Sequence, residues 1–345
     1  MPVRFAKLSI IIFTACVGLL PIKAPLAVNS AVVLMYHRFG ENAHPSTNIL
    51  LEQFEAHLQE LKKPIYTVLP LPEIIDRIKA KKPLPKRTVG ISLDDAFLSV
   101  YKEAYPRLRE AQYPFTLFIA TNPLDRGRKD YMTWDQVREL VKSGATIGSQ
   151  THTHLHMAKS SNLQNKAELE TSNRRFEAEL GKIPNLIAYP YGEYSLAVGK
   201  VAKEQGFSVG FGQHSGVIHP GADMLYLPRF AMNQNYGSLS RLILAVNALP
   251  LETIEVTPKD PLLSRINNPP LLGFTVTGSA ASRLSSLACY VSGQGKVRLE
   301  RLGPRVEVRF KEALPNGRAR INCTMPSSGG RWRWYGLQFF VFNPP

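Results

Sequence analysis

The feature that most limits the possible folds of this chain is a regular alternation of short apolar runs with helical patterns after residue 31. The apolar runs have the length and composition of strands buried on both faces. They cover residues 32–36, 89–93, 115–119, 145–149, 186–189 and 208–211. Helical patterns cover residues 98–111, 133–142, 163–180 and 195–205. Repeated strand–helix units predict a parallel sheet, either closed into a barrel or open and doubly wound.

The first 27 residues predict a secretory signal peptide. Arg4 and Lys7 precede an apolar run over residues 8–20, and Ala24 or Ala27 offers a small residue for cleavage. The run is short for a membrane span, although an uncleaved membrane anchor is the alternative. We therefore expect an exported protein, periplasmic or extracellular.

The pattern changes near residue 251. Prolines punctuate residues 251–270 and predict a linker, and the alternating segments of residues 271–345, separated by glycine turns, predict a small antiparallel β-sandwich-like domain. Signal removal would take Cys16 away and leave Cys289 and Cys323 in this domain. Two cysteines in an exported chain predict one disulfide, with two buried free thiols as the alternative.

Two adjacent carboxylates, Asp94 and Asp95, follow the apolar run of residues 89–93. A turn at the end of a strand can bring both into one pocket, where one carboxylate can bind a metal while the other acts as a general base. The simpler interpretation is an N-cap for the helix predicted at residues 98–111.

Three histidines, His152, His154 and His156, follow the strand predicted at residues 145–149. Imidazoles two or four residues apart at a strand end can share a divalent metal with a carboxylate from a neighbouring strand. A polar loop that happens to be rich in histidine is the alternative. Together, the two clusters favour a site of two histidines and one aspartate.

These motifs resemble those of the polysaccharide deacetylase family, the NodB-like carbohydrate esterases. Residues 92–95 (Ser-Leu-Asp-Asp) are similar to its Thr-Phe-Asp-Asp motif, and residues 188–192 (Ala-Tyr-Pro-Tyr-Gly) to its Arg-x-Pro-Tyr-Gly motif. Residues 34–38 (Leu-Met-Tyr-His-Arg) resemble the first strand of the branch that acts on poly-N-acetylglucosamine. The resemblance covers roughly residues 31–235 and leaves out the β domain.

The resemblance implies a deformed (β/α) barrel over residues 28–250 and a divalent metal, usually zinc. It also implies hydrolysis of N-acetyl groups on an extracytoplasmic amino-sugar polysaccharide. Asp94 would deprotonate a metal-bound water, Asp95 would hold the metal, and a backbone N–H next to Tyr191 would help to stabilise the oxyanion.

The chain departs from the family pattern at its histidine motif. Aligned on residues 147–149, Gln150 stands where the family has its first histidine, and His154 matches the second. The other imidazole would then come from His152 or His156. Alternatively, the segment from His152 to His156 is itself the motif, shifted along the chain.

A second departure is Ala188, which stands where the family has an arginine that orients the base. We expect Arg229 to take that role from another strand end, with an ordinary surface charge as the alternative. For the general acid that protonates the leaving amine we select His214, in a glycine-flanked loop after a strand. A loop histidine that faces solvent is the alternative there.

Four further residues are candidates for binding the sugar: His37, Trp134, Tyr191 and Gly192. Structural packing is the alternative for the aromatic ones. In the β domain, residues 331–335 (Arg-Trp-Arg-Trp-Tyr) interleave cations and aromatics, and residues 251–345 hold 13 Lys and Arg against six Asp and Glu. A contact with the cell envelope or another anionic surface is possible there. No motif for nucleic-acid recognition is present.

The leading interpretation is thus a metal-dependent N-deacetylase. Gln150 and Ala188 leave open a degenerate relative that binds glycans without cleaving them, and an O-deacetylase of another envelope glycan uses the same machinery. A serine esterase is not indicated, because the sequence contains no Gly-x-Ser-x-Gly elbow.

Overall fold

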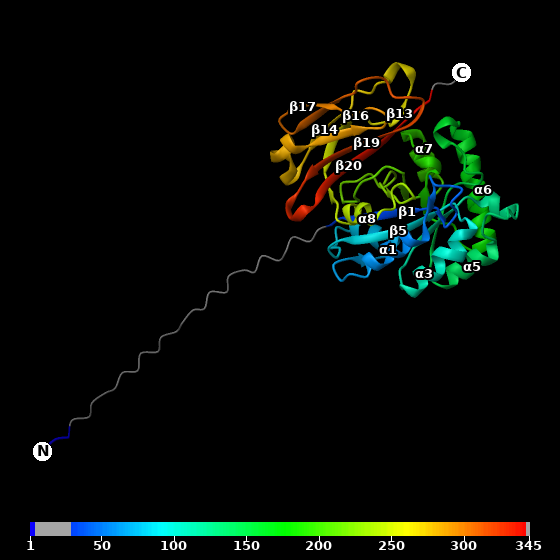
Figure 1. Cartoon of the computed structure of the whole chain (residues 1–345), viewed down its shortest axis with the longest axis horizontal. Helices are drawn as coiled ribbons and strands as arrows, with labels where there is room; N and C mark the ends of the chain where they lie inside the picture. The colour runs from blue at the N-terminus through cyan, green and yellow to red at the C-terminus, as the bar shows by residue number, and fades with distance from the viewer. Residues whose placement is uncertain (4–28, 343–345) are drawn as a thin grey trace.

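The computed structural model describes residues 1–3 and 29–342. The predicted signal peptide therefore lies almost wholly outside the described residues. The described chain forms two packed parts, an α/β part in blue to green and a β domain in yellow to red that covers one side of it (Figure 1).

The α/β part is built on an eight-stranded sheet in which every pairing is parallel. Its order is β10-β1-β5-β6-β7-β8-β9, and β4 pairs with β5. The strands are β1 (Ala31–Tyr36), β4 (Thr67–Val68), β5 (Thr88–Asp94), β6 (Thr116–Ile119), β7 (Thr146–Ser149), β8 (Leu186–Ala188), β9 (Val209–Phe211) and β10 (Phe230–Ala231). Together with the surrounding helices, this sheet confirms the deformed (β/α) barrel.

Helices connect the strands and cover the sheet (Figure 1). They are α1 (Leu51–Leu61), α2 (Leu71–Lys79), α3 (Tyr105–Glu110), α4 (Thr121–Asp125), α5 (Trp134–Lys142), α6 (Asn162–Leu180), α7 (Leu196–Glu204) and α8 (Leu239–Val246). A π-helical turn, η1 (Val100–Ala104), precedes α3, and a short parallel pair, β2 (Arg38–Phe39) and β3 (Asn48–Ile49), follows β1. Side-chain caps at Thr133 and Ser161 start α5 and α6, as the local sequence predicts.

The β domain consists of two sheets, which form a sandwich (Figure 1). One has the order β11-β20-β19-β15-β16, with β13 also paired to β20, and the other has the order β12-β14-β18-β17. The strands are β11 (Leu249–Pro250), β12 (Thr253–Thr257), β13 (Leu262–Leu263), β14 (Gly273–Val276), β15 (Ala288–Val291), β16 (Gly295–Lys296), β17 (Arg298–Leu302), β18 (Arg305–Arg309), β19 (Gly317–Pro326) and β20 (Trp332–Val341).

The segment that we predicted as a linker, residues 251–270, contains β12 and β13 and so belongs to the β domain. Its prolines fall at the interruptions of these strands, where the missing N–H breaks no sheet hydrogen bond. The prolines of the segment therefore predicted where its strands end, but not that these strands pair with others of the β domain.

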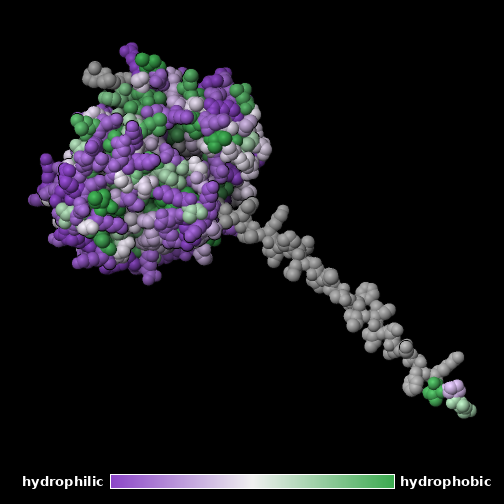
Figure 2. Space-filling view, turned by 180° about the vertical axis from the view of Figure 1, so that it is seen from behind, coloured by the Kyte–Doolittle hydropathy of each residue, from purple (hydrophilic) through white to green (hydrophobic). Residues whose placement is uncertain are grey.

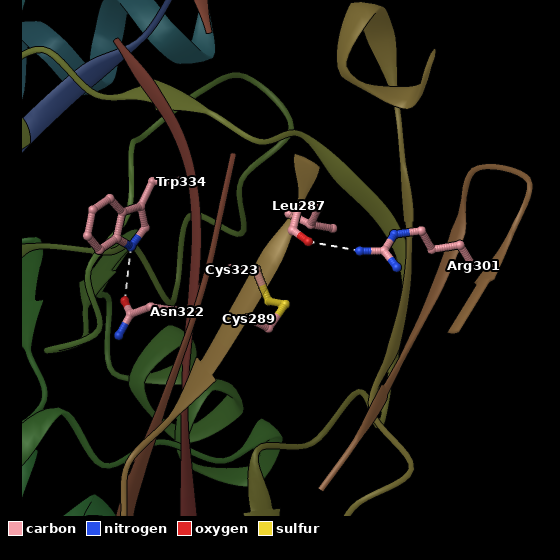
Figure 3. The surroundings of a disulfide bond; sticks show 6 residues. All are labelled: Leu287, Cys289, Arg301, Asn322, Cys323 and Trp334. Atoms are coloured by element: carbon pink, nitrogen blue, oxygen red, sulfur yellow. Dashed lines mark hydrogen bonds between the residues drawn. A yellow bond between two sulfur atoms is a disulfide. The ribbon is translucent and has the colours of Figure 1, made fainter. Parts of the chain in front are cut away.

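A disulfide joins Cys289 on β15 to Cys323 on β19, as predicted. The two residues are direct partners in the antiparallel register of these strands, and both are buried in the core of the β domain. Close by, Arg301 of the opposite sheet donates to the carbonyl of Leu287, and the Trp334 indole donates to Asn322 (Figure 3). The bond thus connects two strands of one sheet.

Among the described residues, no helix is both long enough and apolar enough to span a membrane. On the face in Figure 2, hydrophobic residues occur in small groups among hydrophilic ones. Scattered apolar groups of this kind are normal on folded domains.

Candidate active site

Three loops carry the predicted site, and they follow β5, β7 and β8. These strands belong to one parallel sheet in which the order is β5-β6-β7-β8. Their carboxyl ends therefore lie at the same edge. In barrels and open α/β sheets this edge is where ligands bind.

Asp94 forms a fully buried ion pair with Arg229. The guanidinium donates through Nη1 to Oδ1 at 2.6 Å and through Nη2 to Oδ2 at 2.9 Å, and both side chains are inaccessible to solvent. Arg229 also donates to Ser92 and to the Gly212 carbonyl. His37, at the end of β1, places Nε2 3.8 Å from Asp94 Oδ2. Arg229 therefore has the geometry expected of a residue that orients Asp94.

Asp95 faces His154 from the neighbouring loop. His154 Nε2 lies 3.4 Å from Asp95 Oδ1, and that oxygen is buried without a hydrogen-bond partner. Burial raises the pKa of Asp95, but His154 and the nearby charges of His37 and Arg38 more than offset this, so its pKa lies below the ordinary value. Asp95 is thus favoured as an anion.

Gln150, at the position of the family's first histidine, is fully buried behind Asp95. Its Oε1 accepts the Asp95 backbone N–H at 2.8 Å, and its Nε2 has no partner in the described part of the chain. The amide therefore supports the backbone of the carboxylate loop.

The other two histidines make different contacts. His152 Nδ1 lies 2.7 Å from the Thr121 hydroxyl, at the start of α4. His156 Nδ1 lies 2.8 Å from Oε2 of the buried Glu193, and its ring stacks on Tyr191 with centroids 3.9 Å apart. Of the three predicted ligands, the structure brings only His154 to Asp95.

Asp95 and His154 suit a divalent metal in part. An unpartnered buried carboxylate oxygen that faces an imidazole nitrogen is a donor set that zinc and similar cations accept. Across residues 1–3 and 29–342, however, no group of three His, Cys, Asp or Glu side chains is positioned to hold a metal ion. The chain thus presents two ligands here, with Gln150 behind them.

The third loop forms a turn at Pro190–Gly192 (η3). Tyr191 (φ 61°) and Gly192 (φ 68°) are both in the left-handed region, and a Cβ on Gly192 would lie 2.5 Å from the Gln213 nitrogen. For a tyrosine this conformation costs on the order of 1–3 kcal/mol. His154 meets the Tyr191 ring edge-on at 4.5 Å, so the turn touches the Asp95–His154 pair.

Backbone strain concentrates in these same loops. Asp95, Ala96, Thr151, His154 and Tyr191 all have positive φ, and they are five of the nine non-glycine residues in the described chain that do. Such conformations persist only where the surroundings enforce them, and they gather at functional sites.

His214, the predicted general acid, lies in a cavity of about 260 Å³ between the barrel and the β domain. Tyr226, Trp334 and Leu337 are among its other lining residues. Burial, reinforced by the charges of Arg320 and Arg229, lowers the pKa of His214 to about 3. The imidazole is therefore neutral near pH 7, which does not suit a proton donor.

Trp134 does not support the predicted sugar contact. It starts α5, is 8% exposed, donates to Asp125 and packs edge-on against Phe176. The buried ring is used in helix packing, which was the alternative for aromatic residues.

The segment 331–335 also serves packing. Arg331 and Arg333 donate to backbone carbonyls at Asn247 and Pro250, and Trp334 packs edge-on against Phe230 of the barrel. Arg331 and Trp334 therefore help to hold the two parts of the molecule together, whereas Arg333 bonds to β11 within the β domain.

Sequence reasoning missed two residues near the Tyr191 turn, Gln338 and Glu193. Gln338 reaches the turn from β20, and nothing in its local sequence indicates this. Glu193 directly follows the Pro-Tyr-Gly motif, and this adjacency could have marked it as a site residue.

Comparisons with known proteins identify relatives of the chain. Residues 81–210 match the family model described as polysaccharide deacetylase. The chain is 28% identical over 244 residues to the poly-β-1,6-N-acetyl-D-glucosamine N-deacetylase of Staphylococcus aureus, which spans 62% of this chain and 83% of that protein.

Two solved structures share the fold. The Streptococcus pyogenes deacetylase PplD, in complex with acetate, has a TM-score of 0.58 and 23% identity, covering 63% of this chain and 98% of that one. IcaB from Ammonifex degensii has a TM-score of 0.53 and 25% identity, covering 60% of this chain and 94% of that one. These coverages leave more than a third of the present chain without a counterpart in either protein.

Proposed function

Because the chain belongs to the polysaccharide deacetylase family, we propose that it is an N-deacetylase that acts on an amino-sugar polysaccharide outside the cytoplasm. The observation that carries the proposal is the pair of carboxylates at one strand end, with Asp94 held by Arg229 and Asp95 facing His154. The name of the S. aureus relative supports a poly-N-acetylglucosamine substrate. The basic, apolar N-terminal sequence supports export.

Asp94 is the proposed general base. Arg229 pairs with it and holds both of its oxygens, so the carboxylate is oriented. It takes a proton from the water that attacks the acetamide carbon. When the C–N bond breaks, the same carboxyl group can return this proton to the leaving nitrogen, giving acetate and a free amine.

Asp95 and His154 are the proposed ligands of a divalent cation, zinc among them. When bound, such a cation polarises the acetamide carbonyl. The backbone N–H at Tyr191 is proposed to stabilise charge on the same oxygen, since the left-handed turn sets the direction of that N–H. His37 and the Tyr191 ring border the space in which the sugar would lie.

The test is acetate release from N-acetylglucosamine oligomers, first after chelation and then with zinc or cobalt restored. We expect metal-dependent release by the wild type and a loss of about 10²–10⁴-fold in kcat for Asp94→Asn. Full activity of Asp94→Asn would refute the assignment of the base.

Metal binding is tested separately by calorimetric titration of the chelated protein. Asp95→Asn and His154→Ala should each abolish the binding, whereas Asp94→Asn should retain it. His152→Ala is the matched control, because His152 contacts Thr121 instead of Asp95. An equal loss in His152→Ala would contradict the proposed ligand pair.

Gln150 favours one second candidate, a relative that binds glycans without hydrolysing them. With two ligands positioned at the site among the described residues, metal affinity can be too low for turnover. Oligomer binding without acetate release at any metal concentration, by a protein shown to be folded, would establish this function instead.

A further inference from the structure

The Pro190–Gly192 turn is held from outside the barrel. The Tyr191 carbonyl accepts from Gln338 Nε2 at 3.2 Å and from Arg318 Nη1 at 3.4 Å, and the Gly192 carbonyl accepts from Gln338 Nε2 at 2.8 Å. Gln338 lies on β20 and Arg318 on β19, both in the β domain. The barrel's own side-chain contribution is Tyr226, whose hydroxyl donates to the Gly192 carbonyl at 3.2 Å.

Gln338 is poorly suited to a purely stabilising role. Its side chain is 1% exposed, and its Nε2 is committed to the two carbonyls while its Oε1 has no partner among the described residues. A buried amide whose oxygen is unpaired contributes less to stability than one whose donor and acceptor are both paired. The position therefore gains little in stability from a glutamine, and its two hydrogen bonds go to the turn.

The turn that Gln338 holds is strained and touches the reactive residues. Tyr191 is kept at φ 61°, its ring stacks on His156, and it meets His154 edge-on. The Arg318 guanidinium lies 5.7 Å from the centre of the same ring. A change in the turn would therefore move the Tyr191 N–H and release the imidazole beside Asp95.

We propose that Gln338 is a positioning residue of the active site, and that the β domain completes the catalytic unit instead of acting as a separate binding module. This inference rests on the proposed deacetylase function. Gln338 acts through the Pro190–Gly192 turn and does not itself touch the substrate. It fixes the backbone that faces the acetamide oxygen.

The test compares Gln338→Met and Gln338→Glu with a matched control in the full chain. Methionine keeps the volume without the donor, and glutamate places oxygens against the two carbonyls. The control is Gln294→Met, because Gln294 is also a buried glutamine of the β domain, 8% exposed, whose amide bonds to Glu312 and Lys311 far along the chain from the turn.

For both Gln338 variants we expect kcat for acetate release to fall at least tenfold with KM changed less than threefold. The melting temperature of Gln338→Met should fall no further than that of Gln294→Met, which should keep wild-type kcat, whereas Gln338→Glu buries a carboxylate against two carbonyls and should melt lower. Wild-type kcat in the Gln338 variants, or a loss matched by Gln294→Met, would overturn the proposal.

A second readout does not depend on turnover. In protein labelled with ¹³C at histidine Cε1, the His154 and His156 signals report the Tyr191 ring, which meets His154 edge-on and stacks on His156. Gln338→Met should shift both signals, and Gln294→Met should leave them in place. If the wild type releases no acetate, the deacetylase function fails, and these signals still decide the role of Gln338. Unchanged His154 and His156 signals in Gln338→Met would refute it.

Discussion

At the scale of single residues, the Asp94–Arg229 pair makes the sharpest prediction. Both groups are fully buried, so Arg229→Met leaves an unpaired carboxylate in the interior, and we expect a loss of about 3–5 kcal/mol in the free energy of unfolding. Arg229→Lys keeps the charge but not the two-pronged geometry, so it should recover part of the stability and little of kcat. Urea unfolding and acetate release measure the two effects. An unchanged unfolding midpoint in Arg229→Met would contradict this account.

The same scale shows what the sequence could predict of the site. Asp94 and Asp95 lie at the end of an apolar run, and a strand end fixes where its next side chain lies. The choice among His152, His154 and His156 depends instead on left-handed backbone at Thr151 and His154. Spacing alone carries no information on such conformations.

At the scale of elements, the Pro190–Gly192 turn predicts a contrast between two glycines. Gly192 and Gly181 have similar φ values of 68° and 65°, but a Cβ meets the Gln213 nitrogen at 2.5 Å in the first case and nothing within 4 Å in the second. Gly181→Ala should therefore cost about 1 kcal/mol, through backbone conformation alone. Gly192→Ala should cost more and reduce kcat as well. Urea unfolding measures both variants. Equal losses in their free energies of unfolding would show that the close contact of the new Cβ with Gln213 has no cost.

The Cys289–Cys323 disulfide is the second feature at this scale. It closes a loop between residues 34 positions apart, and the loss of such a loop constraint costs about 3–4 kcal/mol. The double variant Cys289→Ala/Cys323→Ala should unfold at lower urea concentration, and reductant should lower the stability of the wild type but not of this variant. Equal sensitivity of both proteins to reductant would contradict the expectation.

The longer strands of the parallel sheet, such as β1, β5 and β6, were predictable because all of their residues are buried, so no solvent-facing residues interrupt the run. β10 is only two residues long, and β12 lies among prolines, so neither leaves a periodic pattern. Their places depend on partners that are distant in sequence: β1 for the one and β14 for the other.

At the scale of the whole molecule, the contact between barrel and β domain lay beyond sequence reasoning. Residues 331–335 have the composition of a polymer-binding surface, and only the packed structure shows Arg331 and Arg333 donating to carbonyls of the chain between α8 and β12. Side chains of the same composition serve either purpose, and their exposure decides which.

The cavity between the two parts predicts a response to acid. His214 has a pKa of about 3 in the folded protein and about 6.5 in the unfolded chain, so below pH 6.5 only the unfolded chain takes up a proton there. Stability from this group is complete above pH 6.5 and falls as the pH decreases toward 3, by up to about 1.4 kcal/mol per unit. The buried His57, with a pKa of about 4, adds to the effect.

The measurement is urea unfolding between pH 7 and 4.5. His214→Gln removes one titrating group, so its free energy of unfolding should fall less steeply with decreasing pH than that of the wild type. If the free energies of unfolding of the two proteins changed in parallel with pH, His214 would take up its proton equally in the folded and unfolded states.

The contact of Gln338 with Gly192 spans 146 residues and so has a consequence for synthesis. At about 5–20 residues per second, a ribosome makes the turn about 7–30 s before it makes the strand that holds it. A nascent chain that has reached Arg229 already has both members of the buried ion pair but not the support of its strained turn. Enzymatic competence would then arrive late, with the addition of β20, so incomplete chains would carry the motif of a deacetylase without its activity.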